Sequence, residues 1–501
     1  MSLPKMFHLS CSVGLAAVLL AAVPPGRIAT ADNVVGVAPP GSLNPAAGEG
    51  AFRHLQALQD IATANGGNRA AGTIGYDRSA EYVAERLREA GYAVRFEEFE
   101  FPFFEERSPP VLLARKPDGT QEPASAAEAV RTLGNSGSGE VTAPLRAVKL
   151  QLEADPPLAS NSGCDAADFK DFERGAVALV RRGTCQFQVK VDNAVAAGAA
   201  GVVIMNEGNE SNRTDGFSGM LSKAVPIPVV GIPYQLGRAL DSATRADGGT
   251  VRLAVDAVTG KRPTRNVLAD TAASGTDPLI FVGAHLDSVA EGPGINDNGS
   301  GSAAVLEAAL QLAKAPSGIR GHLRFGFWAA EERGLLGSRH HVGALSDEER
   351  RQIAVYVNLD MVGSPNFARF VQHSANAGDG LAALVRSELM AEFRAHDLPA
   401  EERVAGRSGS DDAAFRQKEI PTVGLYTGAS GAKSAEQAGV FGGVAGRPFD
   451  ACYHRACDTT DNINREVLDE NTRALMRALT AAATAAHAPT RKPVDLPQPE
   501  K

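Results

Sequence analysis

The chain is organised around the stretch Gly283-Ala-His-Leu-Asp-Ser-Val289, which leads into Gly294-Ile-Asn-Asp-Asn-Gly-Ser-Gly301. The apolar run Leu279-Ile-Phe-Val282 precedes it, and its short, β-branched and aromatic composition predicts a buried parallel strand. Ligands of open α/β sheets gather at the carboxyl ends of such strands. His285 follows that end directly, and Asp297 comes after a loop rich in Gly, Pro and Asn. We therefore expect a functional site at this edge of the sheet.

The same alternation of apolar runs and helical patterns continues from Thr264 to His487, which predicts an α/β fold with a mostly parallel sheet. Strands are expected at 278–283, 323–329, 353–359 and 421–425, and helices at 301–314, near 334–343, at 381–396 and at 468–485.

Several polar residues follow these strands in the same way, and five of them form a candidate metal site: His285, Asp297, Glu332, Asp360 and His454. Their wide, unequal separations fit ligands from successive loops and not a helical zinc motif. Imidazole and carboxylate ligands without thiolate suit zinc, with cobalt or manganese as alternatives. Five ligands exceed what one catalytic zinc with an open position needs. They suffice for two ions about 3.5–4 Å apart that share a hydroxide, if one carboxylate bridges them.

The neighbours of these ligands supply the remaining chemistry. Asp287 is expected to accept the second ring N–H of His285 and so to fix its tautomer. Glu331 and Glu332 cannot both face the same way on an extended chain, so one binds metal while the other acts as general base. Tyr453 is expected to donate its hydroxyl to the oxyanion of a tetrahedral intermediate.

Each of these residues also has an ordinary explanation. A single loop histidine is usually polar surface, and a single Asp after a strand often caps a helix. Glu331 and Glu332 could be the acidic first turn of a helix. Five such coincidences within one α/β stretch favour the metal site. The other histidines of this region, His322, His340, His341 and His373, have no ligand context and are assigned no metal role.

The whole composition limits the classes of function. A chain of 501 residues is too long for one compact core, and its 44% apolar and 22% charged residues are typical of globular domains. The formal net charge of −9 argues against nucleic acid and anionic membranes as partners.

The first 31 residues have the pattern of a secretory signal peptide. Lys5 precedes an apolar run at 11–23, and Ala29-Thr-Ala31 fits a cleavage site, so the mature protein should begin near Asp32. A membrane anchor is the alternative, but the apolar run is too short to span a bilayer. We expect a secreted or periplasmic protein without a membrane anchor.

Removal of that segment leaves four cysteines: Cys164, Cys185, Cys452 and Cys457. An even number in an exported chain suggests two disulfides, and three pairings are possible. The local pairing Cys164–Cys185 and Cys452–Cys457 is the simplest. In that pairing the second bridge would close a tight loop that holds Tyr453 and His454.

The remaining segments complete the domain plan. Residues 51–129 are expected to begin the catalytic domain, with a helix from Ala51, a helix 78–90 capped by Asp77, and strands near Val94 to Phe101. Residues 130–258 form a separate domain with strands at 177–180, 201–204 and 227–232 and a helix at 187–197, and it carries no ligand cluster. Residues 262–487 are expected to hold the main catalytic part, and residues 488–501 are expected to form a disordered tail.

The domain 130–258 resembles a protease-associated (PA) domain. The resemblance rests on the region around Cys164, on Arg181-Arg-Gly-Thr-Cys-Gln-Phe187, on Ala196-Ala-Gly-Ala-Ala-Gly-Val-Val-Ile-Met-Asn206 and on Ile227-Pro-Val-Val230. It implies a domain that shapes access to the site or binds a protein partner.

The catalytic part resembles the secreted co-catalytic di-zinc aminopeptidases, of the aminopeptidase Y and bacterial leucyl aminopeptidase type. The resemblance rests on the two stretches around His285 and Asp297 and on three further phrases: Phe327-Trp-Ala-Ala-Glu-Glu-Arg-Gly-Leu-Leu-Gly-Ser338, Asn358-Leu-Asp-Met361 and Cys452-Tyr-His-Arg-Ala-Cys-Asp-Thr459. It implies a zinc exopeptidase fold, with a mixed, mostly parallel sheet flanked by helices and an inserted PA domain.

The resemblance also implies a role for each site residue. One zinc takes His285 and Asp360, the other takes Glu332 and His454, and Asp297 bridges them through a turn whose Asp297–Asn298 peptide is cis. Glu331 is the general base, Tyr453 stabilises the transition state, and Arg407 lies near the N-terminal end of the substrate. The sequence departs from the family pattern at Asp412, where a histidine is common.

We therefore expect a secreted zinc aminopeptidase that removes apolar N-terminal residues from peptides. A carboxypeptidase of the glutamate-releasing type is one alternative, but it needs a basic cluster for a terminal carboxylate, and the sequence shows none. A non-catalytic, receptor-like binding protein is the other alternative. That branch loses metal ligands, whereas all five ligand positions are filled in this chain.

Overall fold

The computed structural model describes residues 47–115, 121–123, 129–152, 160–210, 213–245, 249–271, 277–315, 321–406 and 409–486. The expected signal peptide, the expected tail 488–501 and Arg407 lie outside these ranges. Among the residues described, no helix combines the length and the apolar character that a membrane crossing requires.

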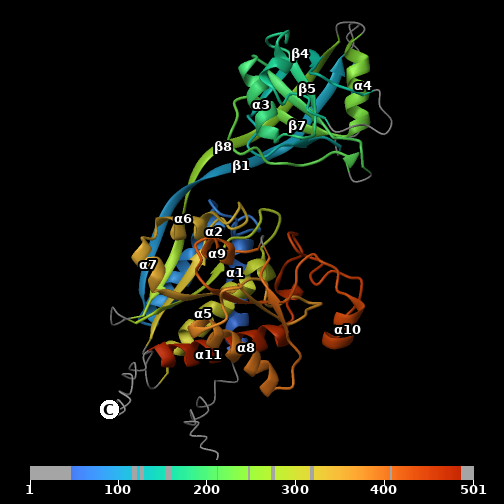
Figure 1. Ribbon diagram of the computed structural model, residues 1–501. Coiled ribbons are helices and arrows are strands. Elements are labelled where there is room, and N and C mark those ends of the chain that lie inside the picture. Colours follow the sequence, from blue (N-terminus) through green and yellow to red (C-terminus); the bar gives the residue numbers. More distant parts are fainter. Residues whose placement is uncertain are drawn as a thin grey trace, which may run out of the picture. The chain divides into compact units, whose positions relative to one another are not determined.

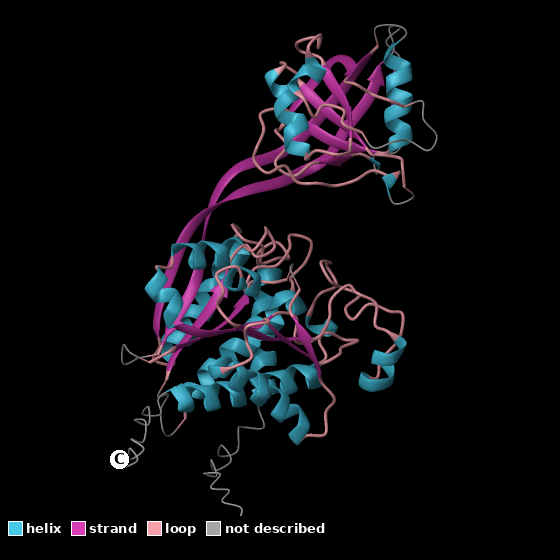
Figure 2. Cartoon of the chain, viewed as in Figure 1, coloured by secondary structure: helices cyan, strands magenta, loops and turns pink. Residues whose placement is uncertain are grey.

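The catalytic part is built on a mixed, mostly parallel sheet, as the sequence predicts (Figure 2). Its strand order is β13-β12-β14-β11-β9-β10-β8. The central strands β14, β11, β9 and β10 are parallel, whereas β12 and β8 run antiparallel to their neighbours β14 and β10. The strands are β8 (Thr250–Asp270), β9 (Leu279–His285), β10 (His322–Trp328), β11 (Ile353–Leu359), β12 (Phe370–His373), β13 (Glu401–Val404) and β14 (Thr422–Tyr426).

Helices cover both faces of this sheet because successive strand residues point to opposite sides. Ile280, Val282 and Ala284 pack into the larger core, whereas Leu279 and Phe281 pack into a second, aromatic core. The larger core holds α1 (Ala47–Ala64), α2 (Ile74–Glu89), α5 (Gly301–Ala313), α8 (Gly380–Ala395) and α11 (Arg465–Ala486), which Figure 1 labels. The aromatic core holds residues of α6 (Leu336–Ala344) and α9 (Asp412–Arg416). Of the remaining helices, α7 (Asp347–Gln352) leads into β11, and α10 (Ala435–Phe441) follows β14.

The start of α2 differs from the expectation. The helix begins at Ile74, one turn before the predicted start, and Asp77 lies in its first turn. Thr73 is the N-cap, because its extended backbone lets its hydroxyl accept the N–H of Tyr76 at 3.4 Å. The sequence prediction of Asp77 as the cap was therefore wrong.

Two long strands connect the catalytic sheet to a second sheet. β1 (Ala93–Arg115) and β8 pair antiparallel from Ala93 opposite Asp270 to Arg115 opposite Thr250. The sequence predicted strands only as far as Phe101, because Pro102 and the acidic residues after it interrupt the apolar pattern. The expected boundary at 258–262 lies within β8, so the two parts of the chain share this strand.

The second sheet continues from β8 through β4, β5, β6 and β7 to β3, and two apolar cores lie against it. Its elements are β2 (Gln121–Pro123), which pairs with β1, and β3 (Arg131–Thr132), β4 (Gly139–Ala147), β5 (Val177–Arg181), α3 (Phe187–Ala196), β6 (Gly201–Met205), β7 (Val229–Ile232) and α4 (Tyr234–Arg245). Cys164 and Cys185 form a disulfide in this part, and Cys452 and Cys457 form another in the catalytic part. The local cysteine pairing is confirmed.

Asp270, at the end of β8, gives a stability prediction. Burial raises the pKa of its carboxyl, but His322, Arg324 and Arg95 outweigh burial and lower it to about 2. Because the pKa of Asp270 is lower in the folded than in the unfolded protein, its ionised carboxylate stabilises the fold above about pH 4. This stabilisation is lost as the pH falls through about 2. We expect Asp270→Asn to lower the free energy of unfolding at pH 7 by up to about 2 kcal/mol. This figure is an upper limit, because Arg95 is half exposed and solvent screens its interaction with Asp270. Urea unfolding should show a smaller difference at pH 3, and a difference that grows on acidification would contradict this explanation.

Candidate metal centre and active site

The strands place the candidate ligands at one edge of the sheet. His285 is the last residue of β9 and lies opposite Trp328, the last residue of the parallel neighbour β10. Glu331 and Glu332 follow in the turn after β10, and Asp360 directly follows β11 on the other side of β9. Because neighbouring parallel strands end at the same edge, these side chains meet there.

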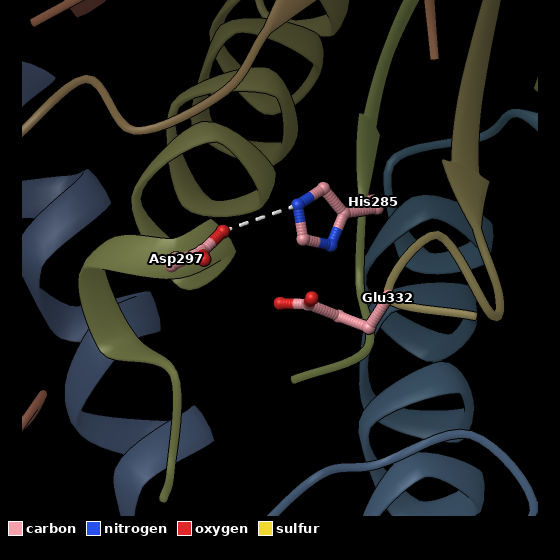
Figure 3. A group of neighbouring side chains, drawn as sticks. All are labelled: His285, Asp297 and Glu332. Carbon is pink, nitrogen blue, oxygen red and sulfur yellow. Dashed lines mark ion pairs between the residues drawn. The ribbon is translucent and has the colours of Figure 1, made fainter. Parts of the chain in front are cut away.

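Asp297 occupies the centre of the group. It lies in the short turn η4 (Ile295–Ser300) before α5, and the Asp297–Asn298 peptide is cis, as the resemblance implied. Its Oδ1 lies 3.3 Å from Nε2 of His285, and its Oδ2 lies 3.1 Å from Nε2 of His454. Figure 3 shows the side chains of His285, Asp297 and Glu332 converging from three segments. The two oxygens of one carboxylate thus reach two different histidines.

Each histidine has a second carboxylate of its own. Oδ1 of Asp360 lies 3.5 Å from Nε2 of His285, and Oε2 of Glu332 lies 3.1 Å from Nε2 of His454. The structure therefore brings together all five residues, grouped as two His–carboxylate pairs on either side of Asp297. Glu331 faces the first pair, with its Oε2 4.0 Å from Nε2 of His285.

The group has the chemistry of a site for divalent cations. Oε1 of Glu332 and Oδ1 of Asp360 are buried without a hydrogen-bond partner. Burial raises the pKa of Glu332 to about 7, and the charge of Asp297 adds to this shift. Burial also raises the pKa of Glu331 well above its ordinary value, and the charge of Asp411 adds to that shift. Buried carboxylates with free oxygens are costly unless they are paired or coordinate a metal. The residues present fit a metal with oxygen and imidazole ligands.

Asp287 lies beside His285, as expected, and makes further contacts in the site. Nδ1 of His285 is 3.1 Å from the main-chain carbonyl oxygen of Asp287 and 3.6 Å from its carboxylate. The carboxylate also accepts the N–H groups of Glu331 and Glu332, at 3.1 and 3.4 Å. Main-chain and side-chain oxygens of Asp287 thus both lie beside Nδ1 of His285, and the carboxylate also fixes the turn that carries both glutamates. The role of the Asp287 carboxylate in fixing the tautomer of His285 stays a prediction.

Tyr453 and His454 lie together in the loop closed by the Cys452–Cys457 disulfide. Their rings stack with centroids 3.9 Å apart. Burial raises the pKa of the Tyr453 hydroxyl, and the charges of Asp297 and Glu332 raise it further. The hydroxyl therefore keeps its proton at neutral pH and can act as a hydrogen-bond donor.

Most of the site residues, but not His285 or Asp287, line a cleft of about 360 Å³. Its walls are formed by Asp297, Glu331, Glu332, Asn358, Asp360, Met361, Gln372, Gly409, Ser410, Leu425, Tyr426, Ala429, Tyr453 and His454. Asp412, where the resemblance led us to expect a histidine, is not part of this lining and accepts a hydrogen bond from Nε of Arg416 at 2.8 Å. The sequence reasoning missed Asp411, a fully buried acid beside Asp412 whose pKa burial raises to about 7.

Comparison with known proteins identifies the family. The model of peptidase family M28 matches residues 266–479, and that of the PA domain matches residues 141–240. An aminopeptidase of Pseudomonas aeruginosa is 42% identical over 425 residues, which cover 83% of this chain and 77% of that protein. The chain belongs to peptidase family M28.

Other aminopeptidases are also similar to this chain. A probable lipoprotein aminopeptidase of Mycobacterium tuberculosis is 38% identical, with 83% of this chain and 81% of that protein covered. The structure of an aminopeptidase from Aneurinibacillus sp. has a TM-score of 0.63 at 25% identity, with 87% of this chain and 93% of that chain covered. A zinc aminopeptidase from Bacillus subtilis gives 0.60 at 26% identity, with 87% and 95% covered. This M28 peptidase, with its PA domain, is a metallo-aminopeptidase.

Proposed function

We propose that this M28 peptidase is an exported aminopeptidase that uses two zinc ions, with a preference for apolar N-terminal residues. The observation that carries the two-ion proposal is the position of Asp297 between His285 and His454, each with a second carboxylate beside it. One ion would be held by His285 and Asp360, the other by Glu332 and His454, with Asp297 shared. Bound zinc supplies a Lewis acid for the scissile carbonyl and lowers the pKa of water.

The side chains of the chain itself divide the remaining work. Glu331 takes a proton from the attacking water and returns it to the leaving amine, because it faces the cleft beside His285 without being a proposed metal ligand. Tyr453 donates its hydroxyl to the oxygen that gains negative charge in the transition state. The acidic lining of the cleft holds the free α-ammonium group of the substrate, which excludes peptides with a blocked N-terminus.

The proposed activity is tested with leucine p-nitroanilide and its N-acetylated form. We expect hydrolysis of the free substrate only, complete loss with a zinc chelator, and recovery when zinc is added back. Turnover of the blocked substrate would contradict the requirement for a free N-terminal amine. Release of residues from the C-terminus of a peptide would favour the carboxypeptidase alternative.

The apolar preference follows from the resemblance and from the wall of the cleft. Met361, Leu425 and Ala429 contribute apolar surface beside the candidate ligands. An apolar pocket discriminates by about 10-fold or more per methylene group. We therefore expect kcat/KM for leucine p-nitroanilide to exceed that for the alanine substrate by at least about 10-fold. Equal values, or a preference for aspartate, would show that another feature of the cleft selects the substrate.

Export rests on the signal-peptide pattern of residues 1–31 and on the two disulfides, which persist in oxidising compartments. N-terminal sequencing of the protein collected outside the cytoplasm should begin near Asp32. The PA domain is proposed to shape access to the cleft or to bind a protein partner.

A further inference from the structure

Asp458 lies behind the candidate metal site and outside the lining of the cleft, in the part of the chain that follows the Cys452–Cys457 disulfide. Its side chain is buried, with 1% of the residue exposed. Its Oδ1 accepts the N–H of Asn296 at 2.8 Å, and its Oδ2 accepts the N–H of Asp297 at 3.0 Å. Its own carbonyl oxygen accepts the N–H of Ile295 at 3.0 Å. One residue therefore binds three consecutive N–H groups of the turn that carries Asp297.

A second buried carboxylate extends this contact to the loop that carries Tyr453 and His454. Asp450 accepts the N–H of Cys452 at 2.7 Å and the side-chain amide of Asn296 at 2.6 Å. The amide of Asn462 donates to both Asp450 and Asp458, at 3.0–3.2 Å. The turn of Asp297 and the disulfide loop of His454 are thus joined by a continuous hydrogen-bond network.

The chemistry of this network requires a carboxylate at position 458. Both of its oxygens face main-chain N–H groups, and an ionised carboxylate is the side chain that offers acceptors only. An asparagine would turn its own NH₂ group toward one of these donors. A buried charge is costly. The charge of Asp458 acts on the buried Arg69, whose guanidinium donates to the carbonyl oxygens of Pro293 and Gly294 at 2.9 and 2.6 Å. A role in fixing the geometry of the site accounts for such a group.

We propose that Asp458 is a positioning residue of the metal centre, which holds the Asp297 carboxylate between His285 and His454 and couples it to the Cys452–Cys457 loop. The proposal rests on the proposed two-zinc function and deepens it. A change at Asp458 should weaken zinc binding and lower kcat, while KM for the peptide changes little, because Asp458 does not reach the cleft.

The test compares Asp458→Asn with Asp461→Asn, a matched change at an exposed aspartate three residues away. Zinc affinity is measured by competition with a chromogenic chelator, and the melting temperature is measured with and without zinc. Outer-shell changes typically lower metal affinity or activity by about 10–100-fold. We expect that loss for Asp458→Asn, together with a smaller rise of the melting temperature on addition of zinc. Asp461→Asn should behave as wild type.

Other outcomes separate the alternatives. If Asp458→Asn lowers the melting temperature of the metal-free protein but keeps the wild-type rise with zinc and the wild-type zinc affinity, Asp458 is structural only and the proposal fails. If Asp458→Asn does not fold, the test uses Asn462→Ala, which removes only the amide shared by Asp450 and Asp458. This variant must show a smaller loss of zinc affinity and of kcat, or the proposal fails. If the wild type itself binds no zinc, the proposed function fails and this inference fails with it.

Discussion

Glu331→Gln should lower kcat by about 10²–10⁴-fold while the protein keeps its full zinc content and nearly its KM. The change preserves the shape of the side chain and removes its capacity to accept a proton. Glu331 faces the cleft beside His285, but in the proposed arrangement it is not a metal ligand. The measurement is steady-state hydrolysis of leucine p-nitroanilide together with the zinc content of the same preparation.

The adjacent residue provides the matched control. Glu332→Gln should also inactivate the enzyme, but through loss of zinc, because Oε2 of Glu332 lies beside His454 and its other oxygen has no partner. Excess zinc should restore part of the activity of Glu332→Gln and none of that of Glu331→Gln. The opposite pattern, in which Glu331→Gln loses zinc and Glu332→Gln keeps it, would exchange the two roles.

Tyr453→Phe should lower kcat by about 10²–10³-fold, the usual effect of removing one donor from an oxyanion site. The Tyr453 hydroxyl stays protonated because burial and the neighbouring carboxylates raise its pKa. Zinc content should not change, and the phenylalanine ring should keep its stacking on His454.

Tyr426→Phe is the control for the loss of a tyrosine hydroxyl in the same cleft. Its effect should be below about 10-fold, because no transition-state contact is assigned to this hydroxyl. A Tyr453→Phe enzyme with wild-type kcat would show that the oxyanion is stabilised by other groups.

The central strands could be predicted from the sequence because each is a continuous apolar run that ends at a polar residue. β11 has the predicted bounds, and β9 and β10 begin or end within two residues of them. The long β1–β8 pair was only partly predicted, because its middle carries prolines and charged residues that resemble a loop. Its strand character comes from pairing between segments about 150 residues apart, which the local pattern does not contain.

The candidate ligands were found because each follows a predictable strand or lies in a recognisable phrase. The residues that hold them in place were missed. Arg69 and Asp458 reach the site by hydrogen bonds to residues more than 150 positions away, and nothing in their local sequence indicates this. The further contacts of the Asp287 carboxylate were also missed, because the two N–H groups that it accepts lie 44 and 45 positions further along the chain.

The most direct test of the two-metal centre is an anomalous difference map at the zinc edge from crystals of the zinc-loaded enzyme. We predict two peaks about 3.5–4 Å apart, both beside Asp297, with one next to His285 and Asp360 and the other next to Glu332 and His454. A single peak in fully active crystals, or peaks away from these five side chains, would contradict the proposed site.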